Sequence, residues 1–240
     1  MTEKEPHAGK EPHPSRRRDQ NPATGSNGTE KAPTRILISP PNFQVIVLEV
    51  RGTAPLMVHR FSAKSLTKMR ATQEAGSTAG KGVKRDKRDF EGDFQGARHI
   101  STEGWDGIHA AAFRAAAIDA CRATGFQMTR AKMSIFVIPD GHDKEDGTPL
   151  VRIRGNAPVT DIRPARNDNG SIDLRARPRW DQWNVVLRIR YDADQFTATD
   201  VANLIERAGM QVGVGEGRPF SEDSYGMGFG TFTVRSDKDG

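Results

Sequence analysis

The stretch Phe43-Gln-Val-Ile-Val-Leu-Glu-Val-Arg51 decides the fold class. It is rich in β-branched residues and is followed by Gly52, a pattern that predicts a β-strand. A second strong strand is predicted over residues 183–191. Shorter strands are predicted over 132–138, 150–154, 172–177, 210–213 and 229–234. Sheet structure therefore runs through most of the folded chain, and the helices have to be placed around it.

The clearest helical pattern covers residues 107–124. It carries eight alanines between Ala110 and Ala123 and stops at Gly125, a residue suited to the position just after a helix. Its small side chains predict close packing against a sheet. A second helix is predicted from Thr197 or Thr199 through residue 208, and a third, after Ser62, from about residue 63 to residue 75.

The order of these elements is not the strict alternation of a doubly wound parallel sheet. It favours an α+β fold in which helices cover one face of an antiparallel sheet. The last part of the chain reads strand, helix, strand, strand, which completes a ferredoxin-like unit related to that of RRM domains. Such a unit leaves one face of its sheet free for a ligand.

The composition changes at two places. Residues 1–35 contain five of the fourteen prolines, the run Arg16-Arg17-Arg18 and no apolar residue larger than alanine except Met1, so a disordered basic tail is predicted. Residues 36–235 then form one domain. Within it, residues 76–98 mix glycine with lysine and arginine, which predicts a long mobile basic loop.

Several functional classes are disfavoured. The chain has no run of 18 apolar residues and no apolar N-terminal stretch like that of a secretory signal, so neither a membrane span nor secretion is expected. The lone Cys121 excludes an internal disulfide and a cysteine-based zinc site. We therefore expect a cytoplasmic protein.

The distribution of arginine is the strongest indication of a ligand. The formal net charge is +5, and residues 151–190 contain nine arginines, no lysine and four aspartates. Arginine recognises phosphate in a forked geometry and stacks on bases. Three segments, 151–154, 174–179 and 187–190, place arginine at every second position, which directs these side chains to one face of each strand. Nucleic-acid binding is predicted; a solvated outer face is the alternative.

A glycine-rich segment follows near the C-terminus. Gly213-Val-Gly-Glu-Gly-Arg-Pro leads to Tyr225-Gly-Met-Gly-Phe-Gly, which predicts main chain shaped to lie against a ligand, or else a flexible hairpin loop. No Walker lysine or dinucleotide-binding pattern accompanies it. No nucleotide cofactor is therefore expected.

Among the aromatic residues, Trp180 and Trp183 are the preferred candidates for base stacking, and Phe43 is expected to be buried. The six histidines show no metal-binding spacing, so no metal is expected. His59, beside Arg60, is a candidate general acid–base for RNA cleavage, although a structural or ligand-contacting role is more typical of a histidine in a turn.

The glycine-rich segment resembles the C-terminal loop of the RAMP-type RNA-binding proteins of CRISPR systems, above all the backbone subunits that line a guide RNA. In such subunits, the helix at 107–124 would lie below the sheet and the loop at 76–98 would form a mobile extension. Residues 228–232 partly resemble the RRM aromatic motif, with Thr231 in place of an aromatic. Residues 55–62 resemble a segment of uncharacterised phage proteins.

These observations predict a non-catalytic protein that binds RNA or single-stranded DNA and coats the strand by self-association as an oligomer or filament. The alternatives are a phage structural or assembly protein, whose arginines meet acidic partner subunits, and a RAMP-type endoribonuclease. The residues predicted to contact nucleic acid are His59, Arg60, Lys84, Arg85, Lys87, Arg88, Arg152, Arg154, Arg175, Arg177, Arg179, Trp180, Arg188, Arg190, Gly215, Gly217, Arg218 and Tyr225.

Overall fold

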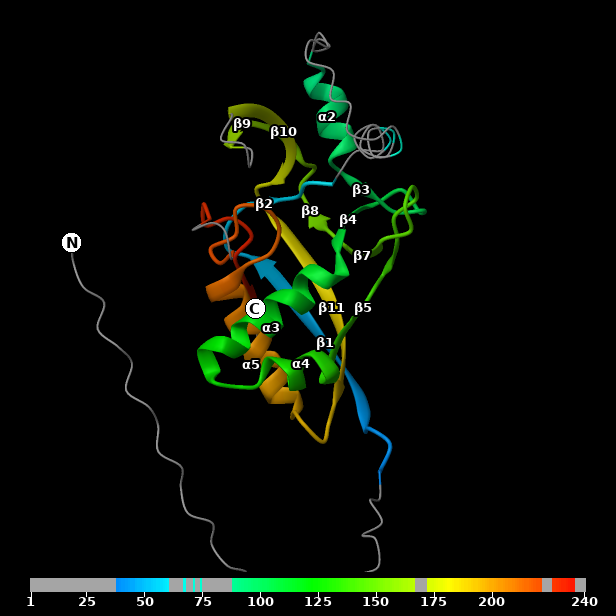
Figure 1. The fold of residues 1–240 in the computed structure, drawn as a ribbon, viewed down its shortest axis with the longest axis vertical. Helices are drawn as coiled ribbons and strands as arrows, with labels where there is room; N and C mark the ends of the chain where they lie inside the picture. The colour runs from blue at the N-terminus through cyan, green and yellow to red at the C-terminus, as the bar shows by residue number, and fades with distance from the viewer. Residues whose placement is uncertain are drawn as a thin grey trace, which may run out of the picture. The chain divides into compact units, whose positions relative to one another are not determined.

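Two long strands pair at the centre of the fold (Figure 1). They are β1 (Phe43–Gly52) and β11 (Trp183–Asp192), which run antiparallel with Phe43 opposite Asp192 and Arg51 opposite Asn184. Both strands were predicted from the sequence and are confirmed. The computed structural model describes residues 38–60, 67, 71, 74, 88–166, 172–221 and 226–235.

Three short strands extend this central sheet. The strand β12 (Phe232–Val234) pairs with β1, whereas β5 (Ile135–Ile138) and β8 (Arg154–Gly155) pair with β11. All these pairings are antiparallel, and the main path is β12-β1-β11-β5. The α+β class with antiparallel sheets is thereby confirmed.

The helices that pack on this sheet are α3 (Ala110–Thr124), α4 (Met128–Ser134) and α5 (Ala198–Arg207). The ring of His109 accepts a hydrogen bond from the backbone N–H of Ala111 and so caps α3, which ends at a left-handed Gly125. Thr197 caps α5 reciprocally with Asp200. A capping arrangement of this kind satisfies backbone donors that a helix end would otherwise leave open.

The core lies between the helices and one face of the central sheet. Leu48 and Val50 of β1 are buried with Leu187 of β11, and they join one hydrophobic cluster with α3 and α5. Close packing of the alanine-rich helix is confirmed, because Ala116, Ala117 and Ala120 are all buried and allow α3 to approach the sheet closely. Alternation along each strand sends the intervening residues to the opposite face.

Two smaller antiparallel sheets flank the central one. One consists of β2 (Leu56–Met57), β10 (Ile172–Trp180) and β9 (Val159–Arg166). The other consists of β3 (His99–Ile100), β4 (Asp106–His109), β7 (Pro149–Arg152) and β6 (Gly141–His142). The strand β9 was not predicted, since its Pro164 and charged residues interrupt the apolar pattern.

Three strand predictions need correction. The strand expected over residues 229–234 forms only over its last three residues, β12. Residues 210–213 were expected to form a strand, but Ala208–Val212 form η1, a π-helical continuation of α5. Ala208 and Val212 are buried there, so the apolar face of α5 continues by one more turn. Residues 132–134 belong to α4, and only the second half of the predicted strand 132–138 forms β5.

The predicted loop over residues 76–98 is also partly wrong. Residues 90–96 form the helix α2 (Phe90–Gly96), whose N-cap Asp89 accepts from the backbone N–H of Gly92 and whose Phe94 is buried. The N-cap and the buried ring of Phe94 both stabilise this short helix. Residues 76–87 lie outside the described part of the chain, as do the predicted tail over 1–35 and the predicted cap at Ser62.

From Pro40 onward the chain forms one compact unit, close to the predicted start of the domain at residue 36. None of the helices in the described ranges combines the length and the apolar character that crossing a membrane requires.

Candidate nucleic-acid interface

The face of the central sheet that points away from the core is here called the open face. Val45 and Val47 of β1 lie on it with 56% and 60% of their surface exposed. Two apolar residues this exposed, at alternate positions on one face of a central strand, indicate a contact surface. The open face comprises Phe43, Val45, Val47, Glu49 and Arg51 of β1, Phe136 and Ile138 of β5, Arg154 of β8, Asn184, Val186, Arg188, Arg190 and Asp192 of β11, and Thr233 of β12.

Strand register arranges these residues in rows, because directly paired residues point to the same face. Val45, Arg190 and Phe136 form one row across three strands. Val47, Arg188 and Ile138 form the next. A third row joins Arg51, Asn184 and Arg154. Each row thus places an arginine beside an apolar or polar neighbour, and the arginines come from three strands.

An aromatic and guanidinium cluster occupies one end of the open face. The rings of Phe43 and Phe136 meet edge to face, with centroids 5.8 Å apart. The guanidinium carbon of Arg190 lies 5.0 Å from each ring centroid. Arg114 of α3 lies 5.0 Å from the ring of Phe136 as well. These flat, cationic and aromatic groups are suited to stacking on unpaired bases.

The charge of the open face is positive. It carries four arginines against two carboxylates, and one of these, Glu49, pairs with Arg235 at 3.2 Å. Arg188 donates to the carbonyl of Pro139 at 2.7 Å and lies 3.1 Å from a carboxylate oxygen of Asp140. Its side chain nevertheless keeps 44% of its surface exposed. The arginines of this face can therefore meet phosphates from solvent.

The arginines of β10 have a different environment. Arg177 is buried and pairs with Glu216 at 2.6 Å. Arg179 pairs with Asp161 at 2.5 Å and with Asp181 at 2.8 Å. The predicted arginine alternation on this strand is present, but carboxylates neutralise these two side chains. Their role in this structure is to hold β9, β10 and the glycine-rich segment together.

His59 and Arg60 are neighbours in sequence but belong to different clusters. His59 lies near Arg175, Arg177 and Glu216, and burial, together with the two arginines and against the effect of Glu216, lowers its pKa. Buried Arg60 instead contacts Glu145 at 2.8 Å, Asp146 at 3.5 Å and Asp143 at 3.6 Å. The side chain of Arg60 is therefore enclosed by carboxylates that stabilise its charge.

Backbone geometry explains the glycine-rich segment. All six of its glycines, at 213, 215, 217, 226, 228 and 230, have positive φ. A Cβ on Gly215 would collide with the carbonyl oxygen of Met57, and one on Gly230 with that of Val214. Gly230 also donates its N–H to the carbonyl of Pro55 at 2.8 Å. In this structure the close approach that these glycines permit is to the protein's own main chain.

Arg218 belongs to the same segment and donates to the carbonyl of Gly215 at 3.3 Å. Four predicted contact residues lie outside the described part of the chain, namely Lys84, Arg85, Lys87 and Tyr225. Arg88 is described and pairs with Asp93 at 2.7 Å and Asp173 at 2.9 Å.

Two aromatic predictions are wrong. Trp180, the preferred stacking residue, is only 2% exposed, and Trp183 is equally buried, with its indole N–H donated to the carbonyl of Ala54 at 2.8 Å. Phe43, expected to be buried, is 39% exposed and lies on the open face. Apolar residues occupy both faces of β1, so alternation alone does not reveal which face is covered.

Of the predicted contact residues, the open face brings together Arg154, Arg188 and Arg190. Arg152 lies on β7 in another sheet, with its guanidinium 6.0 Å from the ring of Trp105. The sequence prediction did not include Arg51 or Phe136, which share the open face. Both residues could have been found from the alternation of side chains along β1 and β5, because each lies on the face opposite to the buried residues of its strand.

Metal ligands do not gather in groups of three or more within the described ranges. No family model matches the chain, and no curated protein sequence shows significant similarity to it. The protein's own surface is therefore the indication of its function.

Proposed function

We propose that this protein binds single-stranded nucleic acid, RNA or single-stranded DNA, on the open face of its central sheet, without catalysing a reaction. The observation that carries the proposal is the contact of Arg190 with exposed Phe43 and half-buried Phe136, whose rings also meet each other, on a face that carries four arginines. Aromatic and guanidinium planes stack on bases while neighbouring arginines neutralise phosphates. The proposed location is the cytoplasm.

The single-stranded form of the ligand follows from the chemistry of this face. Bases of a duplex stack on one another and hide their ring surfaces, whereas the splayed bases of a single strand can lie on aromatic side chains. Val45 and Val47 add apolar surface between the arginines of adjacent strands. This face offers no feature that separates ribose from deoxyribose, so RNA and single-stranded DNA stand equally in the proposal.

The order of elements supports the finer fold that the proposal needs. Taking β1, α3, β5, β11, α5 and β12 in sequence gives strand, helix, strand, strand, helix, strand, and the sheet order is β12-β1-β11-β5. This order is that expected of a ferredoxin-like unit, with one face covered by helices. The glycine-rich segment lies between α5 and β12, which supports the proposed likeness to RAMP-type backbone subunits.

The proposal is tested by anisotropy of labelled 20-nucleotide strands over a salt series. We expect single-stranded RNA or DNA to bind at low salt and the matching duplex to bind much more weakly. The logarithm of the affinity should fall linearly with the logarithm of the salt concentration, by roughly 0.7 per phosphate neutralised. Equal affinity for duplex and single strand, or no binding at low salt, contradicts the proposal.

Self-association forms the second part of the proposal, and one surface favours it. On the hairpin of β9 and β10, Ile162 and Leu174 are about half exposed and Ile172 is 71% exposed. The strand β2 pairs only with Arg179 and Trp180, so this end of the sheet is two-stranded. Two-stranded ribbons are marginal alone and gain stability when their apolar face is covered. We propose that a second copy of the chain covers it, which would let the protein coat a strand.

The same hairpin favours the alternative of an assembly protein, whose contacts do not need nucleic acid. Light scattering after size exclusion, with and without a 40-nucleotide single strand, distinguishes the two functions. Growth of the particle only when the strand is present supports coating. Assembly of the same size in both samples supports the structural alternative.

A further inference from the structure

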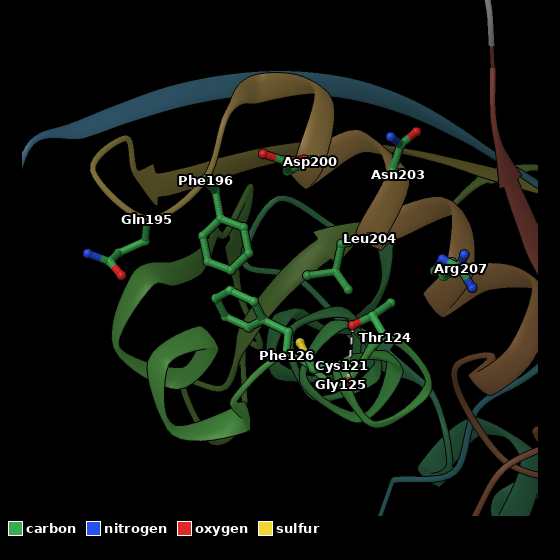
Figure 2. Close-up of a pocket in the computed structure, with 10 residues that line it drawn as sticks. All are labelled: Cys121, Thr124, Gly125, Phe126, Gln195, Phe196, Asp200, Asn203, Leu204 and Arg207. Carbon is green, nitrogen blue, oxygen red and sulfur yellow. Dashed lines mark hydrogen bonds between the residues drawn. The ribbon is translucent and has the colours of Figure 1, made fainter.

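A cavity lies on the helical side of the molecule, between the C-terminal end of α3 and α5 (Figure 2). Its volume is about 430 Å³, within the range of small-molecule sites. Its floor is apolar: Cys121 is fully buried, Leu204 is nearly so, and the rings of Phe126 and Phe196 lie with centroids 4.7 Å apart. In Figure 2 these two rings and Leu204 gather at the centre of the site.

The rim of the cavity is polar and comes from one helix. Asp200, Asn203 and Arg207 occupy positions i, i+3 and i+7 of α5, so they share one face of the helix. Seven residues of α-helix rise about 10 Å, which separates the carboxylate from the guanidinium by that order of length. An acceptor, an amide and a cation therefore follow one another along an aromatic floor.

The acceptor end of this row is held in place. Oδ2 of Asp200 accepts from the backbone N–H of Thr197 at 2.9 Å and from its hydroxyl at 2.7 Å. These hydrogen bonds lower the pKa of Asp200. Arg207 is exposed at the other end of the row, where it belongs to a second, adjoining hollow with Asn203, Met210, Gln211 and Glu206, whose carboxylate accepts from the backbone N–H of Val234.

A ligand that matches this row has a planar ring with hydrogen-bonding groups on one edge. It also carries an anionic group about 10 Å from that edge, to match the rise of α5 between Asp200 and Arg207. We propose that the cavity binds an adenine nucleotide, with its ring against Phe126 and Phe196 and its phosphate at Arg207. The side-chain amide of Asn203 can form two hydrogen bonds with the edge of adenine, and the carboxylate of Asp200 can accept a third from the exocyclic amine. The nucleotide is either free or the terminal nucleotide of a strand.

This site is distinct from the open face, and its occupation does not depend on the proposed function. Titration calorimetry of the full chain with adenosine 5′-monophosphate should give saturable binding with one site. Adenosine, which lacks the phosphate, should bind about tenfold more weakly, because a charge-assisted contact at Arg207 is lost. Uridine 5′-monophosphate, which lacks the exocyclic amine, should also bind more weakly.

Two exposed positions test the assignment without disturbing the core. Arg207→Gln should reduce the affinity for adenosine 5′-monophosphate to that for adenosine, and Asn203→Ala should weaken both ligands. Arg122→Gln, an exposed arginine of α3 outside the cavity lining, is the control and should change neither. Thermal melting checks that each variant is folded. No saturable binding, or binding unchanged in both cavity variants, overturns the proposal.

The source of the nucleotide is resolved with a single strand ending in adenosine 5′-phosphate, compared with the same strand lacking that terminal phosphate. Stronger binding of the phosphorylated strand, lost in Arg207→Gln, indicates the terminal nucleotide of a strand. Binding of the free nucleotide with no preference between the two strands indicates a free nucleotide. If strand binding fails altogether while adenosine 5′-monophosphate still binds, the proposed function fails and this site stands.

Discussion

At the scale of single residues, the role of an arginine in this protein depends on its partners more than on its place in an alternating pattern. Arg177 and Arg190 both belong to Arg-x-Arg strand patterns, but Arg177 is buried against Glu216 whereas Arg190 contacts two aromatic rings on an exposed face. Sequence spacing predicts which face of a strand a side chain occupies. It does not predict which carboxylate the fold brings to that face.

Phe43 provides the first test at this scale. Phe43→Ala should weaken binding of single-stranded RNA or DNA about tenfold, since stacking on one base contributes roughly 1–3 kcal/mol. Phe220→Ala is the matched control, because Phe220 has nearly the same exposure, 37% against 39%, but lies beside Arg122 instead of on the open face. Anisotropy titrations measure both. Equal loss of affinity in the two variants would show that stacking on Phe43 does not contribute to binding.

His59 provides a second test, on pH. Because burial depresses its pKa below the ordinary value of 6.5, the unfolded chain binds the proton more readily than the folded one. The free energy of unfolding should therefore fall as the pH drops below about 6.5, and rise again on return to neutral pH. His59→Gln should make this dependence shallower, and the part that remains includes His109, whose pKa burial also lowers. Urea unfolding between pH 5.5 and 7.5 gives the comparison.

At the scale of elements, local sequence patterns determine some helices and strands, whereas tertiary packing determines others. The strands at 43–51 and 183–191 carry strong local signals and appear as predicted. The alanine-rich helix, predicted over 107–124, forms only from Ala110 onward, because residues 107–109 belong to the strand β4. The strand expected at 210–213 is helical because Ala208 and Val212 continue the buried face of α5. The strand β9 contains Pro164 and forms by pairing with its neighbour β10. Its own sequence does not predict a strand, because the pairing depends on residues elsewhere in the chain.

The glycine-rich segment is an element whose cost of alteration can be measured. Gly230→Ala should destabilise the protein by more than about 2 kcal/mol, because a left-handed residue gains a Cβ that meets the carbonyl of Val214. Gly228→Ala, where φ is also positive but nothing lies within 4 Å of the added carbon, should cost only about 1 kcal/mol. Chemical denaturation compares the two. Equal costs would show that backbone conformation alone, without the close contact, determines the effect.

At the scale of the whole molecule, the protein presents two different sides. One side of the central sheet is covered by α3, α4 and α5 and holds a cavity lined by aromatic rings. The other side is open, basic and partly aromatic. The class of the fold and three arginines of the open face were predicted from the sequence. Its aromatic cluster was not, because Phe43, Arg190 and Phe136 come from strands far apart in the chain and meet only through sheet register.

If single strands bind on the open face, substitutions on this face should weaken binding and substitutions on the helical side should not. The most direct measurement is the affinity of a labelled single-stranded oligonucleotide at low salt for the wild type, for the double variant Phe43→Ala/Arg190→Ala, and for Arg122→Ala on the helical side. We predict that the double variant loses at least about tenfold in affinity, with a smaller salt dependence, and that Arg122→Ala binds like the wild type. Equal affinity of the double variant and the wild type would contradict the account.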